Sequence, residues 1–376
     1  MNEEVTPIFE GCMVVVGTRP EIVKMAPVVR ALEESSLPYL LVHCGQHYDY
    51  EMSQQFIEEL ELPKPDYSFK VKAPSPALQT GKILTLVEKV VKETAPPLVL
   101  VEGDTNGVFA SALATVKLNI PVGHVEAGLR SFDLRMPEEY NRRLVDHMSR
   151  YLFAPTNEAR KNLENENVWG CIYVTGNTVI DAIRQHLPIA ERKSKILKEM
   201  RFDKFALATA HRAENVDDPT VLKSFVEAFV DAPLPIVYPV HPRTTKRLRH
   251  HGLWNQLASS ENVQILPPLG YFDFLLLMKH CEIILTDSGG IQEEATAPEI
   301  RKPVLVLRLS TERPEAVEAG FAKVIGIKKE DILRALEHAL NQKKRLPPSS
   351  PYGDGSAGKR IVKILKNAIY SHKPTL

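Results

Sequence analysis

The stretch MVVVGTRPEIVKMAPVVRAL, residues 13–32, decides the fold class. Its first four residues are apolar and favour a buried strand, and Gly17 then lets the backbone turn tightly. Pro20 suits the first turn of a helix, and the apolar residues after it recur at the spacing of one helical face. These positions are Ile22, Met25, Ala26, Val29 and Leu32. A strand that leads directly into such a helix begins a βαβ unit and indicates a parallel, doubly wound sheet.

Short apolar runs and longer helical patterns alternate along the rest of the chain. Because most runs are continuous rather than alternating, we expect parallel strands that are buried on both faces. The predicted strands are 13–16, 40–43, 98–102, 122–125, 152–154 and 172–174, then 205–209, 236–240, 263–266, 283–286, 304–307 and 324–327. The helix-prone, charged segment 177–204 separates the two sets. The prediction is therefore an α/β protein with two Rossmann-like doubly wound domains that face a ligand cleft.

Composition excludes several classes of partner. The chain has 376 residues, which favours two domains, and 47 basic residues balance 47 acidic ones. Without a global basic field, we expect no binding to nucleic acid or to an anionic membrane, and any phosphate site must be local. The N-terminus is acidic, and no run approaches the roughly 20 apolar residues of a membrane span. The four cysteines form no CxxC pair, so we expect free thiols in a reducing cytoplasm and no metal site.

Polar residues gather directly after the predicted strands. The first group is GTRPE, residues 17–21, and Lys24 lies one turn later. A new helix N-terminus offers free N–H groups, and Arg19 and Lys24 add positive charge, so the group predicts an anion site. The alternative is a plain strand-to-helix turn that carries surface cations.

Carboxylates follow three further segments. Asp104 comes after a buried run and either serves the site or caps the next helix. Glu126 ends another buried strand, while Glu138 and Glu139 open a helix, where acids are also partners of the helix dipole. We expect Asp104, Glu126 and Glu138 to converge beside several arginines. Such surroundings separate the pKa values of carboxyl groups, as proton removal on one face and delivery on the other require.

The segment TDSGGIQEE, residues 286–294, is the strongest local signal in the second half. It follows an apolar strand and opens a helix. Ser288 is placed to cap, and Gly289 and Gly290 let a ligand approach backbone N–H groups, which suits a diphosphate. Glu294 lies one turn further and is placed to bind ribose hydroxyls. The alternative is a helix start softened by glycine.

Two further groups and three missing motifs complete the evidence from the residues. His211 follows a strand and is either catalytic or structural. Arg313 lies at a helix start, where a cation opposes the dipole, so we expect it to serve a ligand. The chain contains no GxGxxG, no GxxxxGK[ST] and no GxSxG motif, which argues against dinucleotide, P-loop and serine-hydrolase chemistry.

Taken together, these segments resemble the non-hydrolysing UDP-N-acetylglucosamine 2-epimerase family. The matching stretches lie in order along nearly the whole chain: GTRPEIVKMAPVV (17–29), GQHYD (45–49), GDT (103–105), PVGHVEAGLRS (121–131), PEEYNR (137–142), TGNTVIDA (175–182), AHR (210–212), YPVH (238–241), LTDSGGIQEEA (285–295) and TERPEAVEAG (311–320).

The resemblance implies the two-domain GT-B fold, with the nucleotide held mainly by the second domain and a C-terminal helix returning to the first. It therefore implies an N-terminal domain of residues 1–176 with 358–376, and a UDP-binding domain of residues 177–357. The implied reaction converts UDP-GlcNAc to UDP-ManNAc. A base removes the C2 proton as UDP leaves C1, and UDP adds back to 2-acetamidoglucal after reprotonation. No cofactor is implied, and a homodimer is expected.

The family's site residues transfer to matching positions of this chain. Asp104, Glu126 and Glu138 resemble the catalytic carboxylates, and His211 resembles the essential histidine near the diphosphate. The implied substrate-binding residues are Arg19, Lys24, Arg142, Phe274, Ser288, Gly289, Gly290, Glu294 and Arg313, with Phe274 behind the uracil ring.

The chain also departs from bacterial members of the family. Ala210 replaces a glycine, the segment between Arg130 and Pro137 is shorter, and 46–49 reads QHYD without the arginine of the GQHR segment. In many bacterial members a second UDP-GlcNAc contacts that segment and activates the enzyme, so the missing arginine argues against this activation. The pattern is that of archaeal-type members.

Three other functions remain as alternatives. A GT-B glycosyltransferase of the retaining type often carries two acids separated by seven residues, but the eighth residue after Glu293 or Glu294 is Arg301 or Lys302. A hydrolysing epimerase would release ManNAc and UDP, and the GTRPE start argues against it by resemblance. A nucleotide-sensing module without catalysis would leave the carboxylates without a role.

Overall fold

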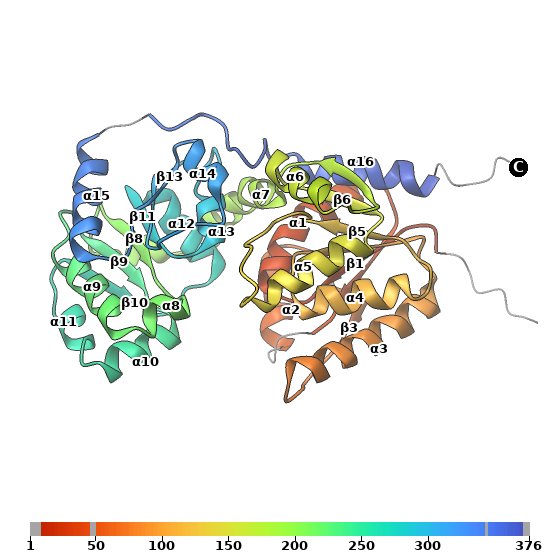
Figure 1. Cartoon of the computed structure of the whole chain (residues 1–376), viewed down its shortest axis with the longest axis horizontal. Coiled ribbons are helices and arrows are strands. Elements are labelled where there is room, and N and C mark those ends of the chain that lie inside the picture. The colour runs from red at the N-terminus through yellow and green to blue at the C-terminus, as the bar shows by residue number, and fades with distance from the viewer. Residues whose placement is uncertain (1–8, 46–49, 343–344, 371–376) are drawn as a thin grey trace, which may run out of the picture. The chain divides into compact units, whose positions relative to one another are not determined.

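The computed structural model describes residues 9–45, 50–342 and 345–370, and the chain divides into two compact units (Figure 1). Unit 1 comprises residues 1–182 and 353–376, and unit 2 comprises residues 183–352. Each unit is built around one parallel sheet with helices in its crossover connections. The segment Gln46–Asp49, on which the expectation about activation depends, lies outside the described residues.

Unit 1 holds a seven-stranded sheet in the order β3-β2-β1-β4-β5-β6-β7. Its strands are β1 Cys12–Val16, β2 Tyr39–His43, β3 Tyr67–Ser68, β4 Leu98–Glu102, β5 Val122–Val125, β6 Tyr151–Ala154 and β7 Cys171–Val174. Its helices are α1 Arg19–Glu34, α2 Tyr50–Glu59, α3 Pro76–Thr94, α4 Asn106–Val116, α5 Pro137–Met148, α6 Asn157–Asn165 and α16 Ala357–Tyr370. The order is that of a Rossmann sheet, in which the direction of winding changes between β1 and β4.

Unit 2 repeats this plan with six strands in the order β10-β9-β8-β11-β12-β13. The strands are β8 Ala206–Thr209, β9 Ile236–Pro239, β10 Val263–Leu266, β11 Ile283–Thr286, β12 Val304–Val306 and β13 Ala322–Val324. The helices are α8 Ala213–Val216, α9 Pro219–Val230, α10 Pro242–His250, α11 Trp254–Ala258, α12 Tyr271–His280, α13 Gly289–Glu294, α14 Pro314–Glu318 and α15 Lys329–Asn341. Helix α7, Thr178–Lys193, and the 3₁₀ turn Ile196–Glu199 form the segment that was predicted to separate the two sets.

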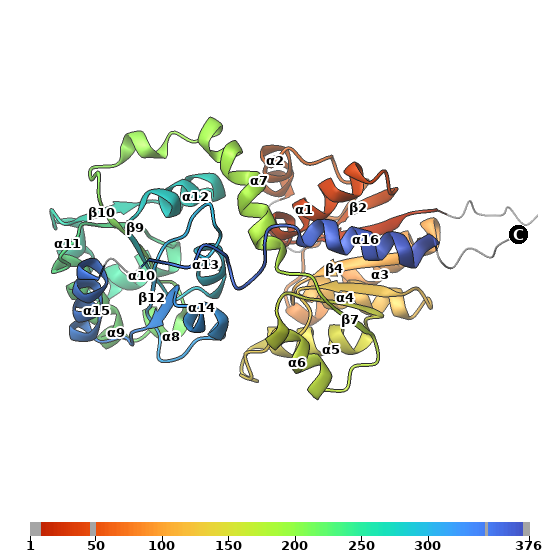
Figure 2. The same cartoon turned by 90° about the horizontal axis from the view of Figure 1, so that it is seen from above.

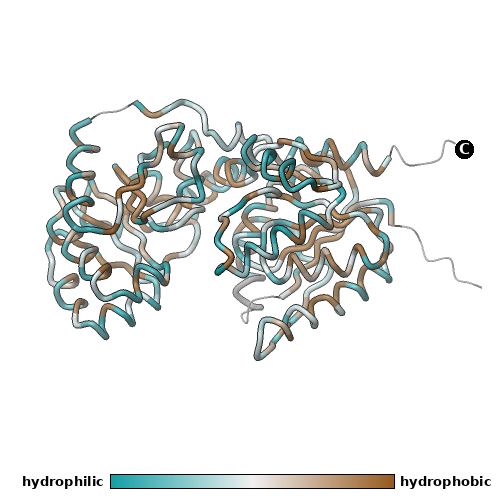
Figure 3. Tube along the Cα trace, in the orientation of Figure 1, coloured by the Kyte–Doolittle hydropathy of each residue, from teal (hydrophilic) through white to brown (hydrophobic). Residues whose placement is uncertain are grey.

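Continuous apolar strands explain the cores of both units. All five residues of β1 and of β4 are buried, as expected for strands covered on both faces. Figure 3 shows hydrophobic residues concentrated along the strands, while the outer helices alternate between hydrophobic and hydrophilic residues. The four cysteines are free thiols, with Cys171 half-buried and the others buried. Among the described residues, no helix is long and apolar enough to span a membrane.

One predicted strand was placed wrongly. The apolar run 324–327 predicted a strand there, but β13 spans Ala322–Val324 and pairs with β12 in parallel. Gly326 has φ of +82°, a left-handed conformation that interrupts an extended strand. The extended segment therefore ends before this glycine and begins two residues earlier than predicted.

The C-terminal helix packs on the first helix of the same unit, as Figure 2 shows for α16 and α1. At Gly358, a built Cβ atom would lie 2.8 Å from the carbonyl oxygen of Pro27, so only glycine fits this close approach. The amide N–H of Gly358 also donates to the Asp181 carboxylate at 2.9 Å. Helix α16 is thus held against α1 and the start of α7.

Candidate active site

The predicted site residues lie after the carboxyl ends of strands, in two sets that belong to different units. In unit 1 they follow β1, β4 and β5. In unit 2 they follow β8, β11 and β12, except Phe274, which lies on α12 after β10. Strands β1 and β4 are neighbours, as are β8 and β11. Each pair brackets the point where its sheet changes winding direction, which is where open α/β sheets bind ligands.

In unit 1, Lys24 on α1 contacts two carboxylates. Its ammonium forms a close ion pair with Glu126 and lies 3.3 Å from Oε1 of Glu102, the last residue of β4. Glu126 has φ of +70°, a strained backbone conformation for a non-glycine residue that is commonly found at functional sites. Sequence reasoning selected Lys24 and Glu126 but gave no role to Glu102.

The turn before α1 is closed by a further buried acid. Glu21 accepts hydrogen bonds from the Gly17 amide at 2.6 Å and from the Thr18 hydroxyl at 2.9 Å. Burial raises the pKa of Glu21 to about 7, while these hydrogen bonds oppose the rise. Arg19, predicted to bind substrate, is exposed, and its guanidinium lies 5.5 Å from the Phe56 ring centroid.

Asp104 is not the cap of the following helix. The N-cap of α4 is Thr105, whose hydroxyl accepts from the Val108 amide at 3.3 Å. The Asp104 carboxylate instead accepts from Arg142 at 2.5 Å, which places two of the predicted site residues in direct contact. The capping alternative for Asp104 is therefore wrong, and its carboxylate is available for another role.

The two adjacent glutamates of α5 have different surroundings. Glu139 is buried and accepts from the Ser131 amide and hydroxyl, both at 2.9 Å, and from Arg142 and Arg143 at 3.0 Å. Burial alone would raise the pKa of Glu139, but these hydrogen bonds and positive charges outweigh it and lower the pKa. Glu138 is exposed. Its predicted catalytic role is untested and stays a prediction.

A buried histidine, which the prediction gave no role, supports the loop that carries Asp104. His124 on β5 is fully buried, and its Nε2 lies 2.8 Å from the Gly103 carbonyl oxygen, so this nitrogen donates. Its Nδ1 lies 2.6 Å from Asp146, which also accepts from the Gly128 amide and pairs with Arg130. This network ties the loops after β4 and β5 together.

In unit 2, Asp287 organises the loop that carries His211. Asp287 is fully buried after β11, and its carboxylate accepts from the backbone amides of His211 and Arg212 and from the Asn215 side chain, each at 3.0 Å. The His211 imidazole is 43% exposed, and its Nδ1 lies 3.4 Å from Asp287. A half-exposed histidine oriented by a buried carboxylate has the arrangement of an acid–base group. The prediction missed this role of Asp287.

The predicted diphosphate loop is open at one glycine. A Cβ atom built at Gly290 would lie within 4 Å of no described atom, whereas one at Gly289 would lie 3.0 Å from the Glu312 carboxylate. Packing within the described residues thus does not require a glycine at 290, which is consistent with ligand approach there. Ser288 holds the N-cap position of α13, but its side chain makes no capping hydrogen bond within this described turn. The predicted N-cap position of Ser288 is confirmed, but its hydroxyl does not make the capping hydrogen bond to any described amide.

Three arginines and two glutamates surround this loop. Arg212 donates to Glu312 at 2.6 Å, Arg308 contacts the same carboxylate, and Arg313 pairs with the buried Glu293. Burial would raise the pKa of Glu312, but Arg212, Arg313 and Arg308 lower it to about 2. These three arginines exceed the two glutamates by one positive charge, and arginine is a preferred partner of phosphate groups. The predicted ligands Glu294 on α13 and Phe274 on α12 are half-buried.

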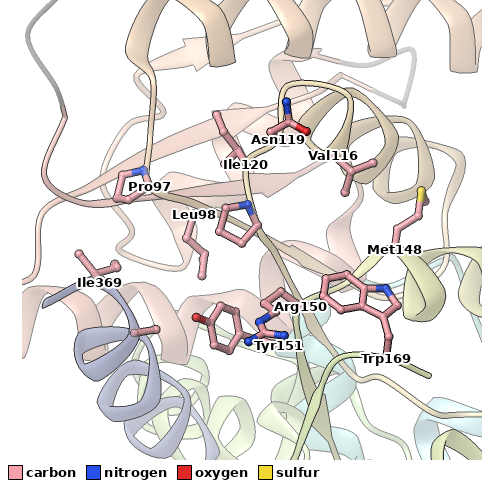
Figure 4. Close-up of a pocket in the computed structure, with 12 residues that line it drawn as sticks. Pro97, Leu98, Val116, Asn119, Ile120, Met148, Arg150, Tyr151, Trp169 and Ile369 are labelled. Carbon is pink, nitrogen blue, oxygen red and sulfur yellow. The ribbon is translucent and has the colours of Figure 1, made fainter. Parts of the chain in front are cut away.

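A separate hollow of about 650 Å³ lies in unit 1 at the opposite ends of the strands (Figure 4). Leu98 and Tyr151, the first residues of β4 and β6, contribute to its lining, and the Arg150 guanidinium lies 5.6 Å from the Trp169 ring centroid. Because its lining is mainly apolar and contains no carboxylate, it does not suit the predicted proton-transfer chemistry.

Comparison with known proteins identifies the family. Residues 30–366 match the model of the family described as UDP-N-acetylglucosamine 2-epimerase. The UDP-N-acetylglucosamine 2-epimerase of Methanocaldococcus jannaschii is 45% identical over 366 residues, which cover 95% of this chain and 99% of that relative. The chain belongs to the UDP-N-acetylglucosamine 2-epimerase family. This confirms the predicted resemblance to an archaeal-type member and places the chain among isomerases.

Solved structures of the epimerase family confirm the fold class of two Rossmann-like domains of the GT-B type. The M. jannaschii UDP-GlcNAc 2-epimerase in complex with UDP-GlcNAc and UDP matches with a TM-score of 0.83 at 45% identity, over 95% of this chain and 99% of that one. The Neisseria meningitidis enzyme bound to UDP-GlcNAc matches with a TM-score of 0.83 at 37% identity, over 95% and 100%.

The family also includes a relative with a different sugar nucleotide. The UDP-2,3-diacetamido-2,3-dideoxy-D-glucuronate 2-epimerase of Pseudomonas aeruginosa is 38% identical, over 94% of this chain and 98% of that relative. Family membership therefore establishes the type of reaction more firmly than it establishes the sugar.

Proposed function

We propose that this protein reversibly interconverts UDP-N-acetylglucosamine and UDP-N-acetylmannosamine by inverting C2. The proposal rests chiefly on the carboxylates around Lys24 and Arg142 in unit 1, because C2 inversion needs positioned groups that accept and return a proton. The arginine-rich loops of unit 2 support it, since the substrate carries a diphosphate. Relatives at 45% and 37% identity have been solved with UDP-GlcNAc bound.

The reaction proceeds by elimination and re-addition. A carboxylate base removes the C2 proton while the C1–O bond to UDP breaks, and the bonding electrons leave with UDP to give 2-acetamidoglucal. The same chemistry then runs in reverse, with a proton delivered to the opposite face of C2 and UDP added back at C1. Two acid–base groups in different environments are needed, and Asp104, Glu126 and Glu138 are the candidates.

The groups in unit 2 stabilise the leaving UDP. His211 and Arg313 are placed to offset the charge that develops on the diphosphate, and Gly289 and Gly290 allow backbone N–H groups to approach it. Ser288 contributes a hydroxyl that is not used for capping, Glu294 binds the ribose, and Phe274 packs against the uracil ring. Arg19, Lys24 and Arg142 hold the sugar, and Lys24 and Arg142 also pair with Glu126 and Asp104.

The test is a proton NMR time course of the purified protein with UDP-GlcNAc in D₂O. The expected result is a UDP-ManNAc anomeric signal, with deuterium at C2 of both isomers. Free ManNAc together with UDP would indicate a hydrolysing epimerase and would overturn the proposal. An unchanged spectrum would also overturn it, and turnover of UDP-2,3-diacetamido-2,3-dideoxy-D-glucuronate in its place would assign the other sugar nucleotide. The same sample, measured by light scattering, tests the predicted homodimer.

A further inference from the structure

One ammonium group serves two carboxylates at the ends of neighbouring strands. Glu102 ends β4 and pairs in register with Val125 of β5, so Glu126 lies one residue beyond the pairing. Lys24 contacts both acids from α1. Within the described part of the chain, Lys24 is the only cation that forms an ion pair with Glu102.

The two carboxylates differ in exposure and in hydrogen bonding. The Glu102 side chain is 2% exposed, and its Oε1 accepts no hydrogen bond from any described residue. The Glu126 side chain is 10% exposed and accepts a hydrogen bond from Lys24. A charged carboxylate is costly when it is buried and one of its oxygens accepts no hydrogen bond, so Glu102 is the member of the pair that holds a proton more easily.

The neighbours of Glu102 reinforce this difference. Glu21 faces it from α1, and Asp104 and Glu126 face it from the loops after β4 and β5. Burial raises the pKa of Glu102 well above its usual value, Lys24 opposes the rise, and these three acids add to it. On β5 next to it, the ring of His124 is already engaged by Gly103 and Asp146.

We propose that Glu102 is a positioning residue that stays protonated during turnover and so leaves the Lys24 ammonium to Glu126. The proposal rests on the proposed function, in which Glu126 is an acid–base group. With Glu102 neutral, Lys24 and Glu126 form a balanced pair, and Glu126 is ionised and able to accept a proton. When Glu102 loses its proton at alkaline pH, two carboxylates compete for one ammonium, and the pair with Glu126 is weakened.

Infrared spectroscopy tests the protonation state without requiring turnover. The protein is labelled with ¹³C at the glutamate carboxyl groups, so that aspartate signals are separated from glutamate signals. At about pH 8.5, well above the usual glutamate range, the wild type should show a carboxylic-acid band that is absent in Glu102→Gln. The matched control is Glu21→Gln, because the pKa of Glu21 is about 7 and its band should already be lost at that pH. Identical spectra for wild type and Glu102→Gln would overturn the proposal.

The pH profile of kcat/KM tests the positioning role. Glutamine has the shape of a protonated glutamate and does not titrate, so the alkaline limb in Glu102→Gln should move up by about one pH unit, a tenfold gain at the pH where the wild type has lost most activity. The test depends on the pH at which kcat/KM falls, and not on the maximum value of kcat/KM. Superimposable profiles would overturn the proposal.

Two further controls keep the test decisive. If Glu102→Gln does not fold, the infrared titration of Glu21→Gln answers the same question, because Glu102 is then the remaining glutamate of this cluster with a raised pKa. Because the Glu21 charge adds to the raised pKa of Glu102, its removal lowers that pKa, and the midpoint of the band decides the test. A midpoint above the usual glutamate range supports the proposal, and a midpoint within that range overturns it. If the wild type fails to epimerise UDP-GlcNAc, the proposed function fails, while the infrared result still decides whether Glu102 holds a proton.

Discussion

Replacing Glu139 by glutamine should destabilise unit 1, whereas replacing its neighbour Glu138 should not. Glu139 is buried and accepts hydrogen bonds from Ser131, Arg142 and Arg143. An amide in its place removes the charge and presents an NH₂ group toward some of these donors. Glu138 is exposed on the same helix, so Glu138→Gln is a control that differs by a single position.

The expected loss in the free energy of unfolding depends on which partners Arg142 and Arg143 keep when Glu139 is replaced. Removing one partner from a buried ion pair typically costs about 3–5 kcal/mol. Arg142 keeps its contact with Asp104, and Arg143 is 34% exposed and lies 3.6 Å from Glu166, so neither arginine is left uncompensated. We therefore expect the lower end, ~3 kcal/mol. With a urea m-value of about 2 kcal/mol/M, the unfolding midpoint should fall by ~1.5 M.

The stabilising contribution of Glu139 should decrease in acid. The pKa of Glu139 is lower in the folded state than the ~4.3 of an unfolded chain, so its stabilising contribution is fully present above that value. The contribution is lost as the pH falls through the lowered folded-state pKa. The difference in stability between wild type and Glu139→Gln should therefore be constant near neutral pH and shrink in acid.

The assay uses the single tryptophan of unit 1. The chain has two tryptophans, and in a Trp254→Phe background only Trp169 remains, whose indole N–H donates to the His147 carbonyl on α5 at 2.7 Å. Fluorescence in urea then reports on the helix that carries Glu139. A midpoint shift below about 0.5 M for Glu139→Gln, or an equal shift for Glu138→Gln, would refute the reasoning.

Three further predictions concern the proposed chemistry, the loops of unit 2 and the C-terminal helix. Positioned acid–base groups typically contribute 10²–10⁴-fold to the rate. Turnover in the NMR assay should therefore fall by about 10²–10⁴-fold in Asp104→Asn, Glu126→Gln and His211→Ala. Their circular dichroism spectra should stay unchanged. Near-wild-type turnover in all three would contradict the assignment. Removing the Glu312 charge beside the predicted diphosphate site should tighten UDP binding in calorimetry by about tenfold, ~1.4 kcal/mol. The exposed Glu214, which lies 3.9 Å from Arg212, provides the matched control Glu214→Gln, and weaker binding by Glu312→Gln would show that this carboxylate helps the ligand. Gly358→Ala should lower stability by about 1–3 kcal/mol through contact with Pro27, whereas Gly81→Ala on α3, with no described atom within 4 Å of its Cβ, should not lower it. Thermal unfolding of the two variants distinguishes these outcomes.

The fold was predictable because its strands are short, apolar and separated by helical patterns. Buried parallel strands such as β4 and β11 carry their signal in consecutive residues, so their bounds were predicted as observed. The two-residue strand β3, Tyr67–Ser68, has no such run and was missed. The bounds of β13 depended on the backbone conformation of Gly326, which apolar runs do not reveal.

The site was predictable where chemistry follows a strand end, and less so where a partner from another segment decides the role. Asp104 and Asp287 both follow strands. Only the structure shows that Arg142 contacts the first, and that the second holds the loop of His211. His124 looks like one more polar residue in an apolar strand until its contacts with Gly103 and Asp146 are known.

The roles of the glutamates were also hard to predict, because they too depend on contacts that the sequence does not reveal. Glu138 and Glu139 are adjacent and equally suited to a helix start, yet the helical rotation buries one and exposes the other. Glu102 ends a strand whose other residues are all apolar, and sequence reasoning passed over it in favour of Asp104. Its position matters because α1 brings Lys24 to it and to Glu126 together. The number of carboxylates near a site therefore does not give the number of bases. Burial, hydrogen bonds and the cations within reach together decide which carboxylates are ionised, and these depend on contacts between segments that are distant in the sequence.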